Sequence, residues 1–245
     1  MSQPVGFWNG FERLILMLTF ISIILGGIAF FWEMGDRREA RGDRKAEAID
    51  RAWTRLLAPA VGNTGKAEAM RYLNTQNQNM SGIDLSCKRM SAGQSWDEDL
   101  SRCSAPIALT RSDLSGILLA NANLNGADLR ASTFSKGHLQ GTKLRGANLH
   151  STDFNGANLE DAVFSRSNLY QAHFIDANLT NADLSGSFLS SADFSRANGL
   201  ASVILKDAWA WADLPPKGLK SKWINLCKFN DQIHKRHLLP PLCQQ

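Results

Sequence analysis

The chain has 245 residues, of which 44% are hydrophobic and 20% are charged, and its formal net charge at pH 7 is +4. These values are ordinary for a folded protein of one or two domains. A net charge this mild does not mark the chain as a nucleic-acid-binding protein, and we expect no such partner.

The first predicted element is a membrane-spanning helix over Leu14–Trp32, which follows an N-terminal tail of residues 1–13. The stretch contains no charged residue and is bracketed by Arg13 and Glu33. It is long enough to cross a bilayer, and the aromatic residues at both ends suit the membrane interfaces. A cleaved signal peptide is the alternative, but the apolar run is too long and no small-x-small cleavage site follows it.

Basic residues around the span predict its orientation. Arg13 is the one Lys or Arg before the span, whereas five follow shortly after it: Arg37, Arg38, Arg41, Arg44 and Lys45. The positive-inside rule places such a flank in the cytoplasm. We therefore expect a single-pass membrane protein with a cytoplasmic C-terminal domain, and a domain on the other side is the alternative.

Residues 33–74 are predicted to form a helical stalk and a short second helix. Charges alternate along the stalk, and Glu33 and Arg37 are spaced to pair across one helical turn. Pro59 and Gly62 end the stalk, and the second helix is expected over residues 65–74, with Met70 and Leu73 facing inward.

The segment over residues 62–66 superficially resembles a phosphate-binding loop. Its glycine spacing is wrong, and Ala67 stands where such a loop needs a metal-binding Ser or Thr. We predict no phosphate site there.

Residues 75–106 are predicted to hold a first five-residue repeat and an inserted loop. The repeat is residues 82–86, but Leu85 and Leu109 are separated by 24 positions, which is not a multiple of five. An excursion over residues 87–106 therefore interrupts the pattern, and we expect it to project near the start of the repeats. It is interpreted as a binding loop or as an insertion that covers the first coil.

Residues 107–199 repeat with a period of five. Eighteen positions from Leu109 to Phe194 are all Leu or Phe, and the residue two before each is nearly always small. In an extended chain these two side chains point to the same side, and the remaining positions must turn a corner. Gly, Asn or Asp often occupies the corner, where tight or positive-φ geometry is required.

A spacing of 20 predicts that four such sides close one coil. The pattern then places identical side chains over one another in a Phe ladder and a Leu ladder. The Phe ladder is Phe134, Phe154, Phe174 and Phe194, and the Leu ladder is Leu129, Leu149, Leu169 and Leu189. Asn158, Asn178 and Asn198 form an outward row at the same spacing.

The repeats Ala-Asn-Leu-Asn-Gly, Ala-Asp-Leu-Arg-Ala and Ala-Asn-Leu-Glu-Asp resemble the pentapeptide-repeat family. That resemblance implies an all-β solenoid, a right-handed quadrilateral β-helix. A solenoid is a scaffold that hosts many roles, so the resemblance implies little about function. A membrane anchor joined to such repeats looks bacterial, which implies an inner-membrane location, with the periplasm as the alternative to the cytoplasm for the domain.

Residues 200–245 are predicted to be an aromatic and basic cap. The repeat decays after Asn198, and four aromatic residues and two Pro-Pro pairs follow. We expect that this tail cannot continue the coil. It is expected to cover the apolar end of the solenoid, which otherwise exposes unpaired strand edges.

Charge is distributed unevenly along the repeats. Residues 107–150 hold five basic and two acidic side chains, whereas residues 151–199 hold two basic and six acidic ones. The rod is therefore predicted to be basic at its start and acidic at its end.

The cysteines form two pairs with equal spacing, Cys87 with Cys103 and Cys227 with Cys243. Two disulfides in an oxidising compartment would explain this pattern, although they conflict with the cytoplasmic topology, which we prefer on the charge asymmetry. Cys227, His234, His237 and Cys243 also form a soft-ligand set for zinc, but their spacing matches no standard finger. No metal or cofactor is expected.

An enzyme is not expected, because Leu and Phe fill the interior and no nucleophile recurs beside His138, His150 or His173. The preferred hypothesis is a membrane-tethered scaffold that presents its outer faces to a protein partner. Self-association into a homo-oligomer stays open.

Two alternative functions remain. Some members of the resembled family protect DNA gyrase by imitating duplex DNA, but here half of the rod is basic. The other alternative, a structural envelope component, requires an extracytoplasmic domain.

Overall fold

The computed structural model describes residues 6–60, 65–91, 96–97, 99 and 101–227. The chain divides into two compact units, the first ending at Asp50 and the second beginning at Arg51.

The first unit consists of most of α1 (Gly6–Leu57). Its most apolar window has a mean hydropathy of 2.4 and is not buried within the protein. Phe31 and Trp32 leave 76% and 73% of their surface exposed. By length and composition this helix is able to cross a membrane, although a signal sequence satisfies the same criteria. The expected ion pair between Arg37 and Glu33 is present at 2.6 Å.

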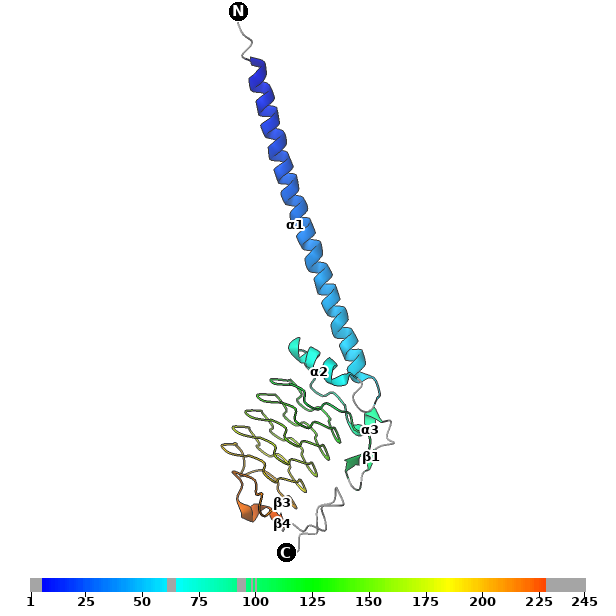
Figure 1. The fold of residues 1–245 in the computed structure, drawn as a ribbon, viewed down its shortest axis with the longest axis vertical. Coiled ribbons are helices and arrows are strands. Elements are labelled where there is room, and N and C mark those ends of the chain that lie inside the picture. Colours follow the sequence, from blue (N-terminus) through cyan, green and yellow to red (C-terminus); the bar gives the residue numbers. More distant parts are fainter. Residues whose placement is uncertain (1–5, 61–64, 92–95, 98, 100, 228–245) are drawn as a thin grey trace, which may run out of the picture. The chain divides into compact units, whose positions relative to one another are not determined.

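The second unit begins with the end of α1 and continues with α2 (Lys66–Thr75). Met70 and Leu73 of α2 are fully buried, as their spacing predicted. The side chain of Asn74 donates a hydrogen bond to the carbonyl oxygen of Ser115 at 3.0 Å. The helix thus lies at the first end of the stacked coils (Figure 1).

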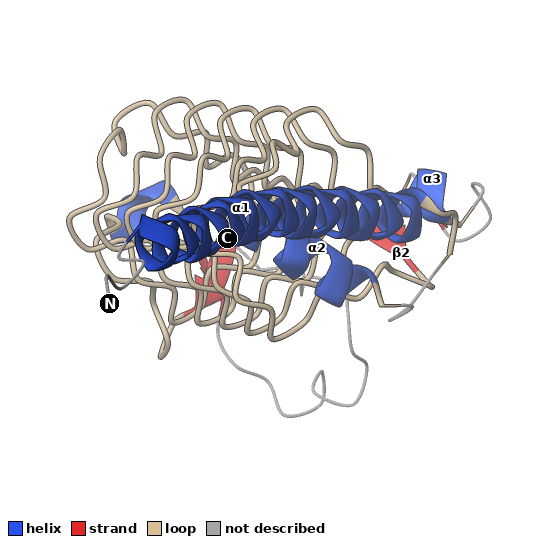
Figure 2. Ribbon diagram, turned by 90° about the horizontal axis from the view of Figure 1, so that it is seen from above, coloured by secondary structure: helices blue, strands red, loops and turns tan. Residues whose placement is uncertain are grey.

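The repeat region is a quadrilateral β-helix whose coils stack side by side (Figures 1 and 2). Parallel bridges join residues 20 apart on every side of the coil, from Ala108 with Asp128 to Asn178 with Asn198. This confirms the predicted register. Positive φ values occur at the corners, as expected at Gly116 and Asn121, but also at Ala131 and Gln171.

Stacked phenylalanines fill one wall of the interior. The ring centroids of Phe134 and Phe154 are 5.4 Å apart, those of Phe154 and Phe174 are 5.2 Å apart, and those of Phe174 and Phe194 are 4.8 Å apart. The four rings are nearly parallel, with interplanar angles of 13° or less. Phe164 contacts two of them edge-on. The predicted Phe ladder is therefore confirmed.

Small inward residues link successive coils through their hydroxyl groups. Buried Ser132, Thr142 and Thr152 each donate to the carbonyl oxygen of the residue 23 positions earlier. Outside the coil, the side-chain amide of Asn178 donates to that of Asn158 at 3.1 Å, so these two predicted neighbours are joined. Hydrogen bonds between successive coils therefore stabilise the β-helix both in its interior and on its outer surface.

The described residues of the excursion pack against the coil, so the expectation that the loop projects is wrong for them. The chain leaves through α3 (Cys87–Met90) and returns through the antiparallel pair β1 (Trp96–Asp97) and β2 (Arg102–Cys103). A Cβ atom placed on Gly126 would lie 2.8 Å from the ring of Trp96, and one placed on Gly146 would collide with the carbonyl oxygen of Ser101. The described residues of the excursion therefore lie along one corner of the coils.

The coil also continues past residue 199, contrary to the expectation that the aromatic tail could not extend it. Ile204, Trp209 and Lys217 pair with residues of the preceding coil, at separations of 21, 21 and 24 positions. Strand β3 (Trp209–Trp211) then pairs in parallel with β4 (Asn225–Cys227), which follows the 3-10 helix η1 (Ser221–Trp223). Short insertions at the corners allow an irregular sequence to add further turns.

Candidate binding surface

Access to ligands is confined to the outside of the coil. The inward Leu and Phe side chains of the repeats are at most 1% exposed, so these side chains fill the interior of the coil. A ligand or partner must therefore meet the outward side chains and the corners.

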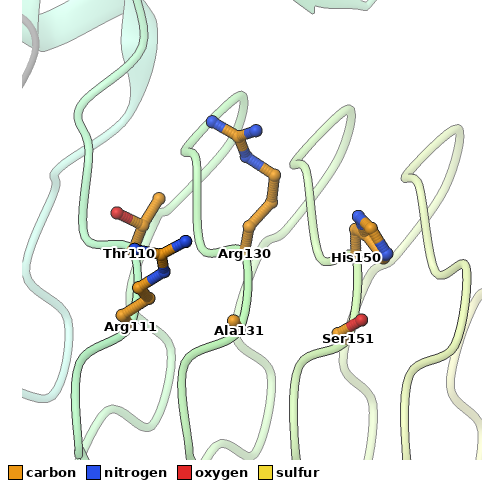
Figure 3. A pocket seen from close by; sticks show the side chains of 6 residues that line it. All are labelled: Thr110, Arg111, Arg130, Ala131, His150 and Ser151. Atoms are coloured by element: carbon orange, nitrogen blue, oxygen red, sulfur yellow. The ribbon is translucent and has the colours of Figure 1, made fainter.

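A shallow groove of about 320 Å³ lies on one corner of the first coils (Figure 3). Three successive coils line it with two residues each: Thr110 and Arg111, Arg130 and Ala131, and His150 and Ser151. Arg111, Ala131 and Ser151 all have φ between 53° and 56°, because they occupy the same corner of successive coils. The groove is therefore a direct product of the 20-residue register.

The groove carries positive charge. Arg130 makes two hydrogen bonds to the carboxylate of Asp128, at 2.7 and 2.8 Å, which raise the pKa of its guanidinium. Asp128 is largely buried, whereas about half of the Arg130 side chain is exposed. Asp128 thus pairs with Arg130, while the groove is also lined by Arg111 and keeps an excess of positive charge.

A row of half-exposed aromatic rings continues from His150 along the outside of the rod. The ring of His150 tilts against that of Tyr170 at 5.1 Å, and Tyr170 stacks on Phe188 at 5.8 Å. Phe188 in turn stacks on Trp209 at 4.2 Å. We call these four residues the outer aromatic row. Their stacking stabilises the later coils, and their exposed edges offer apolar contact area.

Lys66 takes a structural role. Its ammonium group donates to the carbonyl oxygens of Leu56 at 2.9 Å, Arg55 at 3.2 Å and Ala58, so it caps the end of α1. The side chain is fully buried. Its ammonium group is therefore occupied by backbone carbonyl oxygens.

The structure places the predicted site residues as follows. Cys87 and Cys103 are joined by a disulfide with their Cα atoms 6.0 Å apart. Cys227 is also disulfide-bonded, while His234, His237 and Cys243 lie outside the described residues. Within the part of the chain that the structure describes, no group of three or more His, Cys, Asp or Glu residues is placed to hold a metal ion.

The sequence interpretation noted His150 alone and missed its grouping with Arg111 and Arg130. The signal was present, because Thr110, Arg130 and His150 are separated by 20 positions. Reading the outward columns in the way the inward ladders were read would have found the groove.

The repeats match a known family. Three overlapping segments, residues 112–150, 143–179 and 172–198, match the family described as pentapeptide repeats, with eight copies. No curated protein sequence matches the chain.

Several solved structures are similar in part. A pentapeptide repeat protein from the Arabidopsis thaliana thylakoid lumen is 23% identical over 60% of this chain and 72% of its own, with a TM-score of 0.29. QnrB1, a plasmid-mediated fluoroquinolone resistance protein, is 19% identical over 64% of this chain and 81% of its own, with a TM-score of 0.29.

The pentapeptide repeat protein Rfr23 from the cyanobacterium Cyanothece is 22% identical over 57% of this chain and 86% of its own, with a TM-score of 0.26. These TM-scores are low, and the fold therefore rests on the register of the coils and on the family match. The repeat region of this chain belongs to the pentapeptide-repeat family and is a right-handed quadrilateral β-helix.

Proposed function

We propose that this protein is a membrane-tethered, non-enzymatic scaffold whose rigid rod contacts a protein partner through its outer surface. The outer aromatic row supports this proposal most directly. Tyr and Trp are enriched where protein interfaces are strongest, because they add a large contact area at a low cost in conformational entropy. A row that spans several coils offers such area on a rigid support.

The apolar part of α1 supports the tether. Its exposed side chains include Leu16, Phe20 and Phe31. A helix with large apolar residues on all sides is stable when lipid surrounds it. In this proposal the helix anchors the chain and the charged remainder of α1 separates the rod from the bilayer.

The uneven charge supports an electrostatic contribution to partner binding. The later coils hold six acidic and two basic side chains within residues 151–199, so they suit a basic partner. Added salt is expected to weaken such an association, since exposed charges are screened at high ionic strength. Binding that is indifferent to salt would remove this part of the proposal.

The cysteines support an oxidising compartment for the rod. Cys87 and Cys103 are bonded, and so is Cys227. Disulfides persist outside the cytoplasm and are rare within it. The basic residues that follow the span argue for the cytoplasm, but we give the bonded cysteines more weight. The proposed location is therefore the outer side of the inner membrane.

Photocrosslinking in growing cells tests the scaffold role. A benzoylphenylalanine placed at Tyr170 of the full-length protein is expected to form a discrete adduct with another protein. Lys143 is the matched control, because it is exposed on a different side of the coil. Adducts that are absent from Tyr170, or equal at both positions, would reject the scaffold role through this surface.

A purely structural envelope component is the second candidate, and the disulfides support it because disulfides persist mainly outside the cytoplasm. The same crosslinking experiment separates the two. A structural component is expected to give no discrete protein adduct at Tyr170.

The compartment is tested separately by cysteine labelling of intact cells with a membrane-impermeant maleimide. We expect labelling after reduction and none before it. Labelling that occurs after lysis alone, without any need for reduction, would place free thiols in the cytoplasm and reject the proposed location.

A further inference from the structure

The groove on the first coils has the shape and the donors of an anion-binding site. Ala131 forms its floor, and its single methyl group leaves a hollow between Arg111 on one neighbouring coil and Ser151 on the other (Figure 3). A larger side chain at this corner would fill the hollow. Gln171, for example, occupies the same column two coils later, beyond the groove.

The donors around the hollow come from separate coils. Arg111 makes no ion pair or side-chain hydrogen bond with any residue that the structure describes, so its guanidinium is available. Arg130 uses two of its donors on Asp128 and keeps the others. The hydroxyl group of Thr110 adds a further polar partner. The hydroxyl group of Ser151 and the ring of His150 each lie 3.3 Å from Oε1 of Gln171, and they exchange that contact for one to the ligand.

We propose that this groove binds a phosphate group, supplied either by a soluble phosphate compound or by the headgroup of an anionic phospholipid. Coils rise by roughly 4.8 Å, so the donors on three coils span about 10 Å. A carboxylate has two oxygens on one side, so it contacts few of these donors at once. A phosphate group presents several acceptor oxygens in different directions, and arginine binds it in a forked, bidentate geometry.

This site goes beyond the scaffold role and does not depend on it. The outer aromatic row starts at His150, at the edge of the groove. A ligand with a phosphate end and an apolar body would therefore find the phosphate donors and the aromatic edges on one continuous strip.

Isothermal titration calorimetry of the full-length protein in a neutral detergent, with inorganic phosphate as the titrant, tests the proposal. Arg111→Gln removes one charged donor and is expected to weaken binding about tenfold or more. Glutamine is tolerated at this corner, because Gln171 already occupies it with φ of 57°. Ala131→Leu fills the floor without changing any charge and is expected to abolish binding.

Lys143→Gln is the matched control, since it removes the same charge from a different side of the basic coils. It is expected to leave phosphate binding unchanged. Circular dichroism checks that each variant keeps the β-helix. Wild-type protein that does not bind phosphate, or equal losses in Arg111→Gln and Lys143→Gln, would overturn the proposal.

Two further titrants identify the source of the phosphate group. Dihexanoyl phosphatidylglycerol, used below its micelle concentration, is expected to bind more tightly than inorganic phosphate if the ligand is a lipid. Dihexanoyl phosphatidylcholine, which carries a compensating positive charge, serves as its control. Inorganic phosphate that binds as tightly as the phosphatidylglycerol supports a soluble phosphate compound. Phosphatidylcholine that binds as tightly as both would show that the groove does not select anions, and would overturn the proposal.

Discussion

The guanidinium of Arg166 donates a hydrogen bond to the backbone carbonyl oxygen of Asp99 at 2.5 Å, although 67 positions separate the two residues. Arg166 lies on the corner column of Gly126 and Gly146. The excursion also contacts the corners at Gly126 and Gly146, which belong to two earlier coils. The hydrogen bond from Arg166 therefore attaches it to a third coil.

Gly146→Ala is predicted to dislodge the excursion. The new methyl group would collide with the carbonyl oxygen of Ser101, in addition to the strain of placing Ala at φ of 64°. Gly116→Ala is the matched control, because its φ is 68° and nothing lies within 4 Å of the added Cβ. We expect both variants to lose roughly 1 kcal/mol of unfolding free energy through backbone strain. Gly146→Ala is expected to lose about 1–3 kcal/mol more through the collision.

Chemical denaturation measures the two losses, and limited proteolysis within residues 87–106 reports on docking. Cleavage is expected to accelerate in Gly146→Ala alone. Equal behaviour of the two variants would show that the excursion does not depend on contact with this corner.

Removal of the Cys87–Cys103 disulfide is predicted to destabilise the same segment. The bond closes a loop of 16 positions, and a loop of that size corresponds to about 3 kcal/mol of lost chain entropy in the unfolded state. The double variant Cys87→Ser, Cys103→Ser should lower the unfolding free energy by up to that amount. A reducing agent also breaks the disulfide of Cys227, so wild-type protein in that agent should lose at least as much stability as the double variant. An unchanged denaturation midpoint in the double variant would contradict the prediction.

Phe174→Ala is predicted to be among the most damaging single changes in the coil. Phe174 is fully buried and stacks on Phe154 and Phe194. Its loss leaves a cavity, and the expected cost is about 3–5 kcal/mol of unfolding free energy. Phe174→Leu is expected to cost less, about 1.5 kcal/mol, because most inward positions on the other sides of the coil hold Leu and accommodate it. Chemical denaturation compares the two, and similar losses would contradict the prediction by showing that Leu does not replace the stacked ring.

Lys66→Met is predicted to loosen the end of α1. The substitution keeps most of the length of the side chain but leaves the carbonyl oxygens of Arg55, Leu56 and Ala58 without their donor. The expected loss of unfolding free energy is about 1–3 kcal/mol. Lys143→Met, at an exposed position, is the control and is expected to lie within about 0.5 kcal/mol of the wild type.

The pH dependence of stability offers an independent test of Lys66. Burial lowers the pKa of its ammonium group below the usual value of 10.5. The unfolded chain therefore binds more protons than the folded one at pH values between the lowered pKa and 10.5, and stability is expected to rise with pH across this window. Lys66→Met should lack this rise. A variant that retains the rise would assign it to another group.

The repeats could be predicted from the sequence because the same pattern of inward and corner residues recurs eighteen times with a period of five. Each inward Leu or Phe lies over another inward Leu or Phe one coil away, so the 20-residue register alone determines which side chains are in contact. The same regularity predicted the positive φ at Gly116 and Asn121.

The irregular parts could not be predicted in this way. Whether the excursion projects or lies flat depends on the contacts of Trp96 and Ser101 with glycine corners that are far away in sequence. The extra turns after residue 199 depend on one-residue and longer insertions, such as the offset of 21 positions between Asp183 and Ile204. Insertions of this kind remove the periodic signal while the backbone pairing continues.

Alternation along each side of the coil separates two tasks within one short repeat. Asn148 lies between buried Ala147 and Leu149 and faces outward, as do its equivalents on every coil. Substitutions at such positions leave the interior untouched. The surface of the rod is thus free to vary column by column, so that new specificities can arise by point substitution without a new fold.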